Sequence, residues 1–249
     1  MDDAARAYNT PDFSLRLPDA TRLGDTLPAR VGDAAPEFEA PILDGEAFRL
    51  SDARGQQHVV LMMGSITSPM CAIHVPALNR LQRQFGSRGV RFFLVYTKES
   101  HPGEHYAHHT SMEQKLSYAR DLRRLEAVEF PILVDSLDGR VHRSYGPWPT
   151  SLFVVHRDGR LVYRNTIADP RALEGFLEEL LDADALAAQP DHVPHIGYLE
   201  RIVEHNADEA AHYRVYERAG PKAFEDYWQA FPAMRGHWPR PPGEQEGAR

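Results

Sequence analysis

The amino-acid sequence between residues 58 and 85 reads HVVLMMGSITSPMCAIHVPALNRLQRQF. It begins with an apolar run of strand length, His58–Met63, and turn residues follow at 64–69. Beyond the turn, apolar side chains recur at the spacing of one helix face, at Val75, Leu78, Leu81 and Phe85. The stretch therefore predicts a buried strand, a tight turn and a helix. At such a helix start, free backbone N–H groups and the helix dipole stabilise an anion.

Cys71, the only cysteine among the 249 residues, lies at this predicted helix start, three residues after Ser68. A single cysteine forms no intramolecular disulfide, which fits a reducing compartment, and we expect a cytoplasmic protein. Two interpretations of Cys71 are open, a reactive thiol and a small buried side chain. For Ser68 we favour a helix cap that accepts the N–H of Met70 or Cys71 over a nucleophile, because the sequence offers no convincing Ser-His-Asp arrangement.

The composition is that of an ordinary soluble globular chain, with 42% hydrophobic and 26% charged residues. The formal net charge of -8 argues against nucleic acid or an anionic membrane as an obligatory partner. No apolar run approaches the ~20 residues of a membrane span. The N-terminus lacks the basic and apolar regions of a secretory signal. Because the sequence has no dinucleotide-binding or phosphate-loop motif, we expect no organic cofactor.

Strand and helix patterns alternate after the central stretch. Val90–Tyr96 and Phe130–Asp135 are apolar runs typical of buried strands, and a helical pattern separates them. One hairpin turns at Asp44-Gly45 and another at Asp158-Gly159, and a last helix begins at Asp169-Pro170. This order predicts an α/β fold of the thioredoxin type, with three α/β/α layers and a mixed sheet.

The sequence pattern divides the chain into four parts. Residues 1–30 are expected to form a poorly ordered arm, residues 31–183 the thioredoxin-like domain, residues 190–233 a helical extension and residues 234–249 a flexible tail. Within the extension, helices are predicted near 198–203, over 208–219 and from Pro221 onward. About forty residues cannot bury an aromatic face alone, so we expect the extension to pack on the main domain or on a second subunit, as a homodimer. The aromatic face comprises Phe224, Tyr227, Trp228 and Phe231.

In a thioredoxin-type site, a C-x-x-C motif begins the helix, and its first chalcogen lies where the helix dipole favours a thiolate. Here that position holds Ser68-Pro69-Met70-Cys71. A proline followed by threonine, usually after a cis bond, lines the substrate groove opposite. Pro149-Thr150 stands where this proline is expected, just before the strand predicted at 151–156, and we predict a cis Trp148–Pro149 bond. Trp148 is either a lid on the groove or part of the core.

Four short segments carry a family resemblance: Gly64–Pro69, Leu94–Tyr96, Glu99–Pro102 and Tyr145-Gly146. Together they resemble the iodothyronine deiodinase family and its bacterial relatives, which belong to the thioredoxin-like redoxins, and the resemblance extends from Val31 to Leu181. In that family the residue between Thr and Pro is a selenocysteine or cysteine nucleophile. The resemblance thus places Ser68 at the nucleophile and matches His101 to the active-site histidine, with Glu99 beside it.

The resemblance implies a thiol-dependent oxidoreductase with a small-molecule or thiol substrate and a thiol electron donor. Its catalytic residues would be Thr67, Ser68, Cys71 and His101, and its groove would be lined by Pro69, Glu99, Trp148, Pro149 and Thr150. A serine cannot cycle through sulfenic acid or a disulfide, and the helix dipole lowers a pKa by roughly one unit, too little to form an alkoxide. Thiol chemistry would therefore run through Cys71 alone. The rival hypothesis is a redox-inactive scaffold that binds a protein or small-molecule partner in the same groove. Whether Ser68 is native or replaces a cysteine or selenocysteine is open from the sequence.

Two further groups of side chains have alternative interpretations. His101, His105, His108 and His109 are spaced like metal ligands, but we favour a solvated polar loop and expect no metal. Asp135, at the end of a predicted strand, either lies at the sheet edge where sites form or caps the next short helix.

Overall fold

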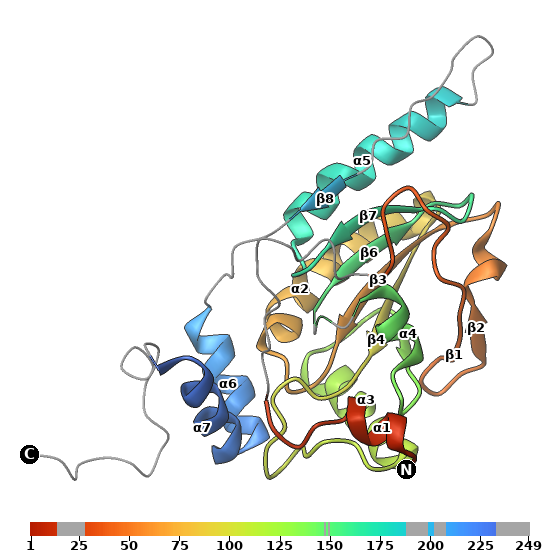
Figure 1. The fold of residues 1–249 in the computed structure, drawn as a ribbon. Helices are drawn as coiled ribbons and strands as arrows, with labels where there is room; N and C mark the ends of the chain where they lie inside the picture. Colours follow the sequence, from red (N-terminus) through yellow and green to blue (C-terminus); the bar gives the residue numbers. More distant parts are fainter. Residues whose placement is uncertain (14–27, 147, 149, 188–198, 202–207, 233–249) are drawn as a thin grey trace, which may run out of the picture.

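The structure is a computed structural model, and it describes residues 1–13, 28–146, 148, 150–187, 199–201 and 208–232. Its centre is a six-stranded mixed sheet in the order β5-β4-β3-β6-β7-β8 (Figure 1). The strands are β3 (His58–Gly64), β4 (Val90–Tyr96), β5 (Ile132–Val134), β6 (Leu152–Val155), β7 (Leu161–Asn165) and β8 (Leu199–Arg201). β3, β4 and β5 run parallel, and β6 runs antiparallel to both β3 and β7. The strands predicted at 58–63, 90–96, 130–135 and 151–156 are therefore neighbours in one sheet.

Both faces of β3 and β4 are covered, because successive side chains of a strand point to opposite faces. Val60 and Met62 face one apolar core with residues of α2 (Pro69–Phe85), α3 (Met112–Leu125) and α5 (Pro170–Ala187). Leu61 and Met63 face a second core with residues of α4 (Arg140–Tyr145) and the hairpin of β1 (Glu39–Pro41) and β2 (Ala47–Arg49). The continuous apolar runs in the sequence reflect this burial on both faces.

The turn between β3 and α2 is compact. Ser68 is the N-cap of α2, and its side chain accepts a hydrogen bond from the backbone N–H of Cys71 at 3.3 Å. Pro69 follows as the first helical residue. Gly64 ends β3 so close to the helix that a β-carbon there would lie 2.6 Å from the Cys71 sulfur. The helix start is thus pressed against the end of the strand.

Two helices of the extension, α6 (Glu209–Ala219) and α7 (Pro221–Ala230), pack as a pair beside the start of α2 (Figure 1). Asp208 caps α6 through a bond from the N–H of Ala211. Phe224, Tyr227 and Trp228 are buried within the chain. This face packs within one chain, on the rest of the α6–α7 pair and on Ala72 of α2, and packing on a second subunit stays a prediction.

Two of our expectations need correction. Leu199–Arg201, predicted as part of a helix, form strand β8, because the free edge of β7 offers a parallel hydrogen-bonding partner that outweighs local propensity. The arm expected to be poorly ordered contains α1 (Asp3–Tyr8), and the Tyr8 hydroxyl lies 2.7 Å from His142 Nδ1. Residues 188–198, 202–207 and 234–249 and the Trp148–Pro149 bond lie outside the described residues. None of the helices in the described ranges is long and apolar enough to cross a bilayer.

Candidate active site

The candidate site lies where β3 and β4 end side by side. The parallel register pairs Gly64 with Tyr96, so the turn that follows β3 and the loop that follows β4 meet at the same sheet edge. The turn after β3 and the start of α2 supply Thr67, Ser68 and Cys71. The loop after β4 supplies Glu99 and His101. The two sequence motifs singled out above are thereby brought together.

A buried carboxylate, Glu99, is the centre of this site. Thr67 donates to Glu99 Oε2 twice, from Oγ1 at 2.6 Å and from its backbone N–H at 3.2 Å. The Tyr96 hydroxyl donates to Oε1 at 2.5 Å, and His109 Nε2 lies 2.9 Å from the same oxygen. Burial raises the pKa of Glu99, but His109, Thr67 and Tyr96 outweigh burial and hold it below its ordinary value. Glu99 is therefore a carboxylate at neutral pH.

His101 joins the same network through its backbone. Its N–H donates to Thr67 Oγ1 at 3.1 Å, so this hydroxyl receives one hydrogen bond and passes one on to Glu99. The imidazole stacks on Phe13 with ring centroids 4.1 Å apart. On another side, His101 Nε2 lies 3.4 Å from the Tyr216 hydroxyl of α6. The side chain is 7% exposed, although the sequence suggested a solvated loop.

His109 belongs to the Glu99 network, although it was not among the site residues predicted from the sequence. We placed it in the same solvated loop, but it is fully buried between Tyr96 and Tyr118, against Glu99. Burial lowers the pKa of His109 despite the neighbouring carboxylate. Its spacing from Glu99 gave no signal, since the contact depends on how the loop after β4 folds back.

Ser68 and Cys71 both have the environment of structural residues. Ser68 is 3% exposed and its hydroxyl caps α2, as expected. Cys71 is fully buried and packs in the core that contains Leu94. Burial strongly raises the pKa of the Cys71 thiol, and the Glu126 carboxylate raises it further. The sulfur is therefore a thiol at neutral pH in this conformation, which favours the second of the two interpretations of Cys71.

Thr150 and Trp148, which were predicted to line the groove, make contacts with neighbouring loops. Thr150 forms a parallel bridge with Ile167, and its carbonyl accepts the N–H of Ala168 at 2.9 Å. Trp148 is half-buried, and its carbonyl lies 2.9 Å from His142 Nε2. Pro149 lies outside the described residues. The segment around Thr150 thus adjoins the loop before α5, where we had no site residue.

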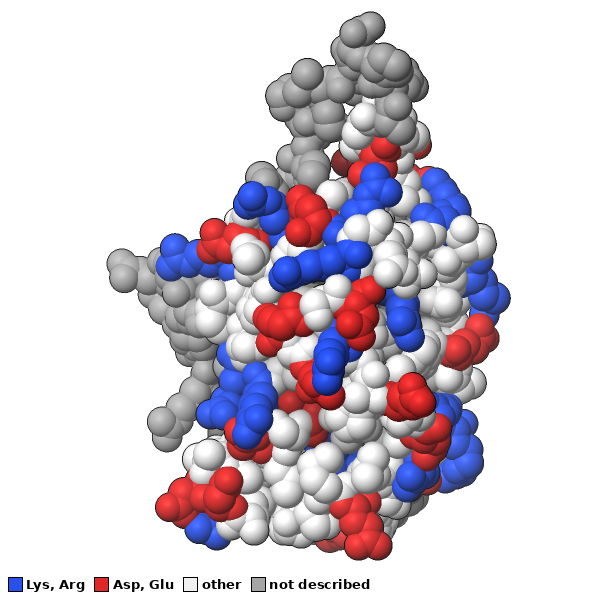
Figure 2. All heavy atoms as spheres, turned by 90° about the vertical axis from the view of Figure 1, so that its right-hand side faces the viewer, with Lys and Arg blue, Asp and Glu red and all other residues white. Residues whose placement is uncertain are grey.

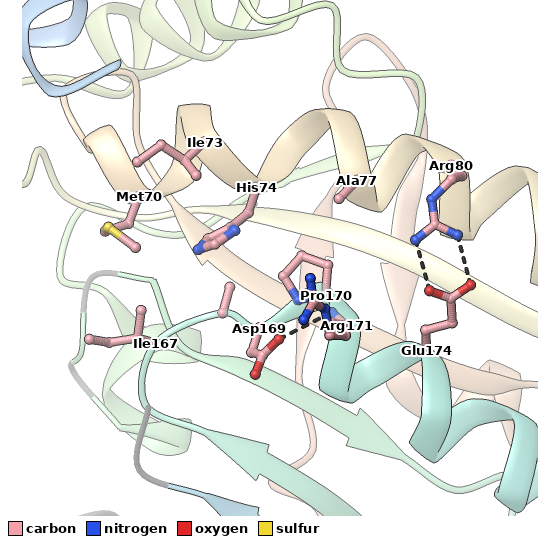
Figure 3. Close-up of a pocket in the computed structure, with 11 residues that line it drawn as sticks. Met70, Ile73, His74, Ala77, Arg80, Ile167, Asp169, Pro170, Arg171 and Glu174 are labelled. Atoms are coloured by element: carbon pink, nitrogen blue, oxygen red, sulfur yellow. Dashed lines mark hydrogen bonds and ion pairs between the residues drawn. The ribbon is translucent and has the colours of Figure 1, made fainter. Parts of the chain in front are cut away.

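A pocket of about 540 Å³ lies between α2 and this loop (Figure 3). His74 projects from α2 toward Ile167 and Asp169. Burial lowers the pKa of His74 to about 4, so the imidazole is neutral at physiological pH. The Arg80–Glu174 pair, with two bonds of 2.7 and 2.8 Å, closes one end. The pocket is lined by Met70, Ile73, His74, Ala77, Arg80, Ile167, Ala168, Asp169, Pro170, Arg171 and Glu174.

Asp135 has the structural role we left open. It accepts hydrogen bonds from the backbone N–H groups of Ser136, Val141 and His142, and so caps the first turn of α4. Lys115, fully buried nearby, donates to the Ser136 carbonyl at 3.2 Å. Burial lowers the pKa of Lys115 to about 8.

Metal-ligand spacing occurs away from the predicted histidine loop. Among the described residues, the side chains that converge like ligands are His58, His156 and Asp184, whose ligand atoms lie within 4.8 Å of one another. His58 Nδ1 accepts the backbone N–H of Arg157 at 3.2 Å, so its Nε2 carries a proton directed at Asp184. His156 Nδ1 lies 3.2 Å from the backbone nitrogen of Asp158 and 2.9 Å from the carboxylate of the same residue, and its Nε2 lies 3.3 Å from Asp184. The two histidines and Asp184 form a clamp that joins α5 to the sheet by hydrogen bonds, and at His58 the Nε2 proton leaves no lone pair there for a metal.

A model of the Redoxin family matches residues 30–180. Thyroxine 5-deiodinase of Ovis aries is 29% identical over 147 residues, 55% of this chain and 49% of that protein. The Gallus gallus enzyme of the same name is 30% identical over 141 residues, 52% of this chain and 54% of that protein. The chain thus spans about half the length of the curated relatives it matches. A putative protein disulfide isomerase of Bacteroides thetaiotaomicron superposes with a TM-score of 0.50 at 18% identity, over 63% of this chain and 94% of that one, and this likeness confirms the thioredoxin-like fold.

Proposed function

This chain belongs to the redoxin family, and on that basis we propose that it is a thiol-dependent oxidoreductase of the deiodinase-like type that acts at the turn between β3 and α2. The observation that carries the proposal is the buried Glu99 network. Burying a carboxylate costs free energy unless several donors satisfy it. A loop and a helix start need no such group, so its presence beside Thr67 and His101 supports a chemical role.

The proposed reaction is thiol–disulfide exchange through Cys71. Its thiolate attacks a disulfide, forms a mixed disulfide and releases one thiolate from the substrate. A second small thiol then attacks the mixed disulfide, restores Cys71 and leaves as a new disulfide, so the thiol donor supplies the electrons.

Glu99 and Cys71 are electrically coupled in this proposal. The Glu99 carboxylate is among the charges that raise the pKa of Cys71. Neutralisation of that charge would therefore favour the Cys71 thiolate.

The partners we propose are a small-molecule or thiol substrate, which approaches through the pocket beside Met70, and a thiol electron donor. Nucleic acid is not among them, and a cytoplasmic location remains our proposal. On the face drawn in Figure 2, basic and acidic side chains alternate over short distances. A homodimer stays a proposal as well, although Phe224, Tyr227 and Trp228 of the aromatic face that suggested it are buried within one chain.

A redox-inactive scaffold is the second candidate function, and the burial of Cys71 favours it. In this candidate, Ser68 only caps the helix, Cys71 only fills the core, and the pocket between α2 and α5 binds a partner. The two candidates share every feature of the fold and differ in whether the sulfur ever reacts.

Turnover assays of three chains distinguish these candidates. We expect weak insulin-disulfide reduction and weak peroxide turnover by the native chain, a marked gain for Ser68→Cys, which completes C-x-x-C, and loss for Cys71→Ser. Activity that survives in Cys71→Ser would contradict the thiol proposal and direct attention to His101. If Ser68→Cys gains nothing, the scaffold is the better account.

A further inference from the structure

The imidazole of His101 is enclosed by parts of the chain that lie far from it in sequence. Phe13 covers one face, and the Tyr216 hydroxyl and the Tyr227 ring, 5.9 Å away between centroids, cover another side. We refer to Phe13, α6 and α7 together as the cap. No part of the cap belongs to the two apolar cores of the sheet.

The cap has an apolar cluster of its own. Seven of the eight buried members come from α6 and α7, and the eighth is Ala72, which follows Cys71 in α2. Phe13 packs against this cluster. The apolar cluster of the cap is therefore separate from the two cores of the sheet, and it meets the main domain at Ala72 of α2 and at the rings around His101.

Polar contacts also attach the cap to the main domain. Arg214 and Arg218 of α6 pair with Glu126, whose side chain is 7% exposed. The backbone N–H of Lys222 donates to both carboxylate oxygens of Glu104 at 3.1 Å. The side-chain ammonium of Lys222 lies 2.8 Å from the Asp12 carboxylate. The main-domain partners in these contacts lie at the end of α3, on the loop after β4 and on the N-terminal segment.

The loop that carries His101 is shaped for this contact. A β-carbon at Gly103 would lie 2.2 Å from the Ala219 carbonyl oxygen, and one at Gly220 would lie 2.2 Å from Glu104 Oε2. The N–H of His105 donates to the same Ala219 carbonyl at 3.0 Å. The junction of α6 and α7 thus sits directly on the loop next to His101.

We propose that the cap is an autoinhibitory cover, which opens as a unit to expose His101 and the start of α2 while the sheet stays folded. The proposal rests on the function proposed above, since it regulates the same site. Local opening requires less free energy than global unfolding when few apolar contacts and several polar ones hold a segment. Added salt weakens those polar contacts and favours opening.

Carbethoxylation of His101 by diethylpyrocarbonate, followed by peptide mass spectrometry on the full chain, tests the cap. Glu126→Gln should raise the modification rate of His101 by at least about tenfold, because it removes the charge that holds two arginines. Phe13→Ala should raise it without touching an ion pair. Glu129→Gln, which removes an exposed partner of Arg83 on α2, is the matched control and should leave the rate unchanged.

His142, fully buried beneath Tyr8, reports whether the main domain remains folded. The cap proposal predicts that His101 reacts in Glu126→Gln while His142 stays protected. Equal rates at both histidines, or an unchanged rate at His101 in both cap variants, would overturn it. The modification of His101 is measured without any turnover assay. If the cap opens but the chain has no exchange activity, only the proposed function is contradicted. If the chain is active but His101 never becomes accessible, only the cap proposal is contradicted.

Discussion

Gly64 lies where the end of β3 meets the first turn of α2, and the absence of a side chain there lets Cys71 fit. We expect Gly64→Ala to destabilise the fold by about 1–3 kcal/mol, because the added β-carbon would fall 2.6 Å from the sulfur. Urea unfolding followed by circular dichroism measures the change. Gly175→Ala, at an exposed position of α5 with open space around it, is the control and should add up to about 1 kcal/mol of stability. A Gly64→Ala chain as stable as the native one would contradict this packing.

His74 is a buried imidazole whose protonation opposes folding. Its pKa falls from the ordinary 6.5 to about 4 on folding, so the unfolded chain binds more protons between these values. Stability is therefore complete above about pH 6.5 and decreases as the pH falls toward 4, by on the order of 3 kcal/mol from this residue. His74→Leu should flatten the dependence, which urea midpoints at pH 7.5 and 4.5 would reveal. An equal difference between the two midpoints in both chains would refute this account of His74.

The long apolar strands and the amphipathic helices were predictable because local pattern reports burial. β3 and β4 are buried on both faces, so their apolar runs are continuous, and the starts of α2 and α5 carry the expected Ser68 and Asp169 caps. β8 was not predictable, since it is three residues long and its pairing with β7 decides its conformation. The helix α1 escaped notice for a similar reason, because its anchor, Tyr8, contacts a histidine 134 positions away.

Within the candidate site, too, local motifs were predictable from the sequence and contacts between distant segments were not. Thr67, Glu99 and His101 could be singled out from short motifs, and the parallel register then brings them together. His109 and the pocket residues could not, because their contacts arise from loops that fold back on the sheet. The sequence alone could not decide whether Cys71 is a reactive thiol or a small buried side chain, and the structure shows that it is buried.

The clamp of His58 and His156 on Asp184 attaches α5 to the sheet, and it provides a test at the level of one helix. Asp184→Ala should cost about 1–3 kcal/mol, because the buried N–H of His58 loses its acceptor and His156 loses a partner. Asp182→Ala, at an exposed position of the same helix, should cost almost nothing. Zinc added to the native chain should not raise the melting temperature, since the Nε2 of His58 has no free lone pair. A zinc-dependent rise that Asp184→Ala abolishes would show that these residues are ligands after all.

At the scale of the whole molecule, the cap covers the candidate site at His101. Two apolar cores hold the sheet between its helices, and a third, smaller cluster belongs to α6 and α7. The sheet and the cap are therefore expected to unfold separately. Hydrogen exchange should show α6 and α7 amides exchanging faster than those of β3, and faster still in high salt, while β3 is unaffected. Equal protection of the helices and the strand would mean that the chain opens only by global unfolding.

Whether Cys71 exchanges with a disulfide separates the oxidoreductase from the scaffold. The native chain is incubated with an aromatic disulfide such as dithionitrobenzoate, and its intact mass is followed with time, with Cys71→Ser as the control. We predict one mixed disulfide per chain at Cys71, which forms more slowly than with a free small thiol because the sulfur reacts only from an open state, and which excess thiol reverses. A native chain that stays unmodified while the urea-unfolded chain reacts at once would contradict thiol chemistry at this site and leave the partner-binding scaffold.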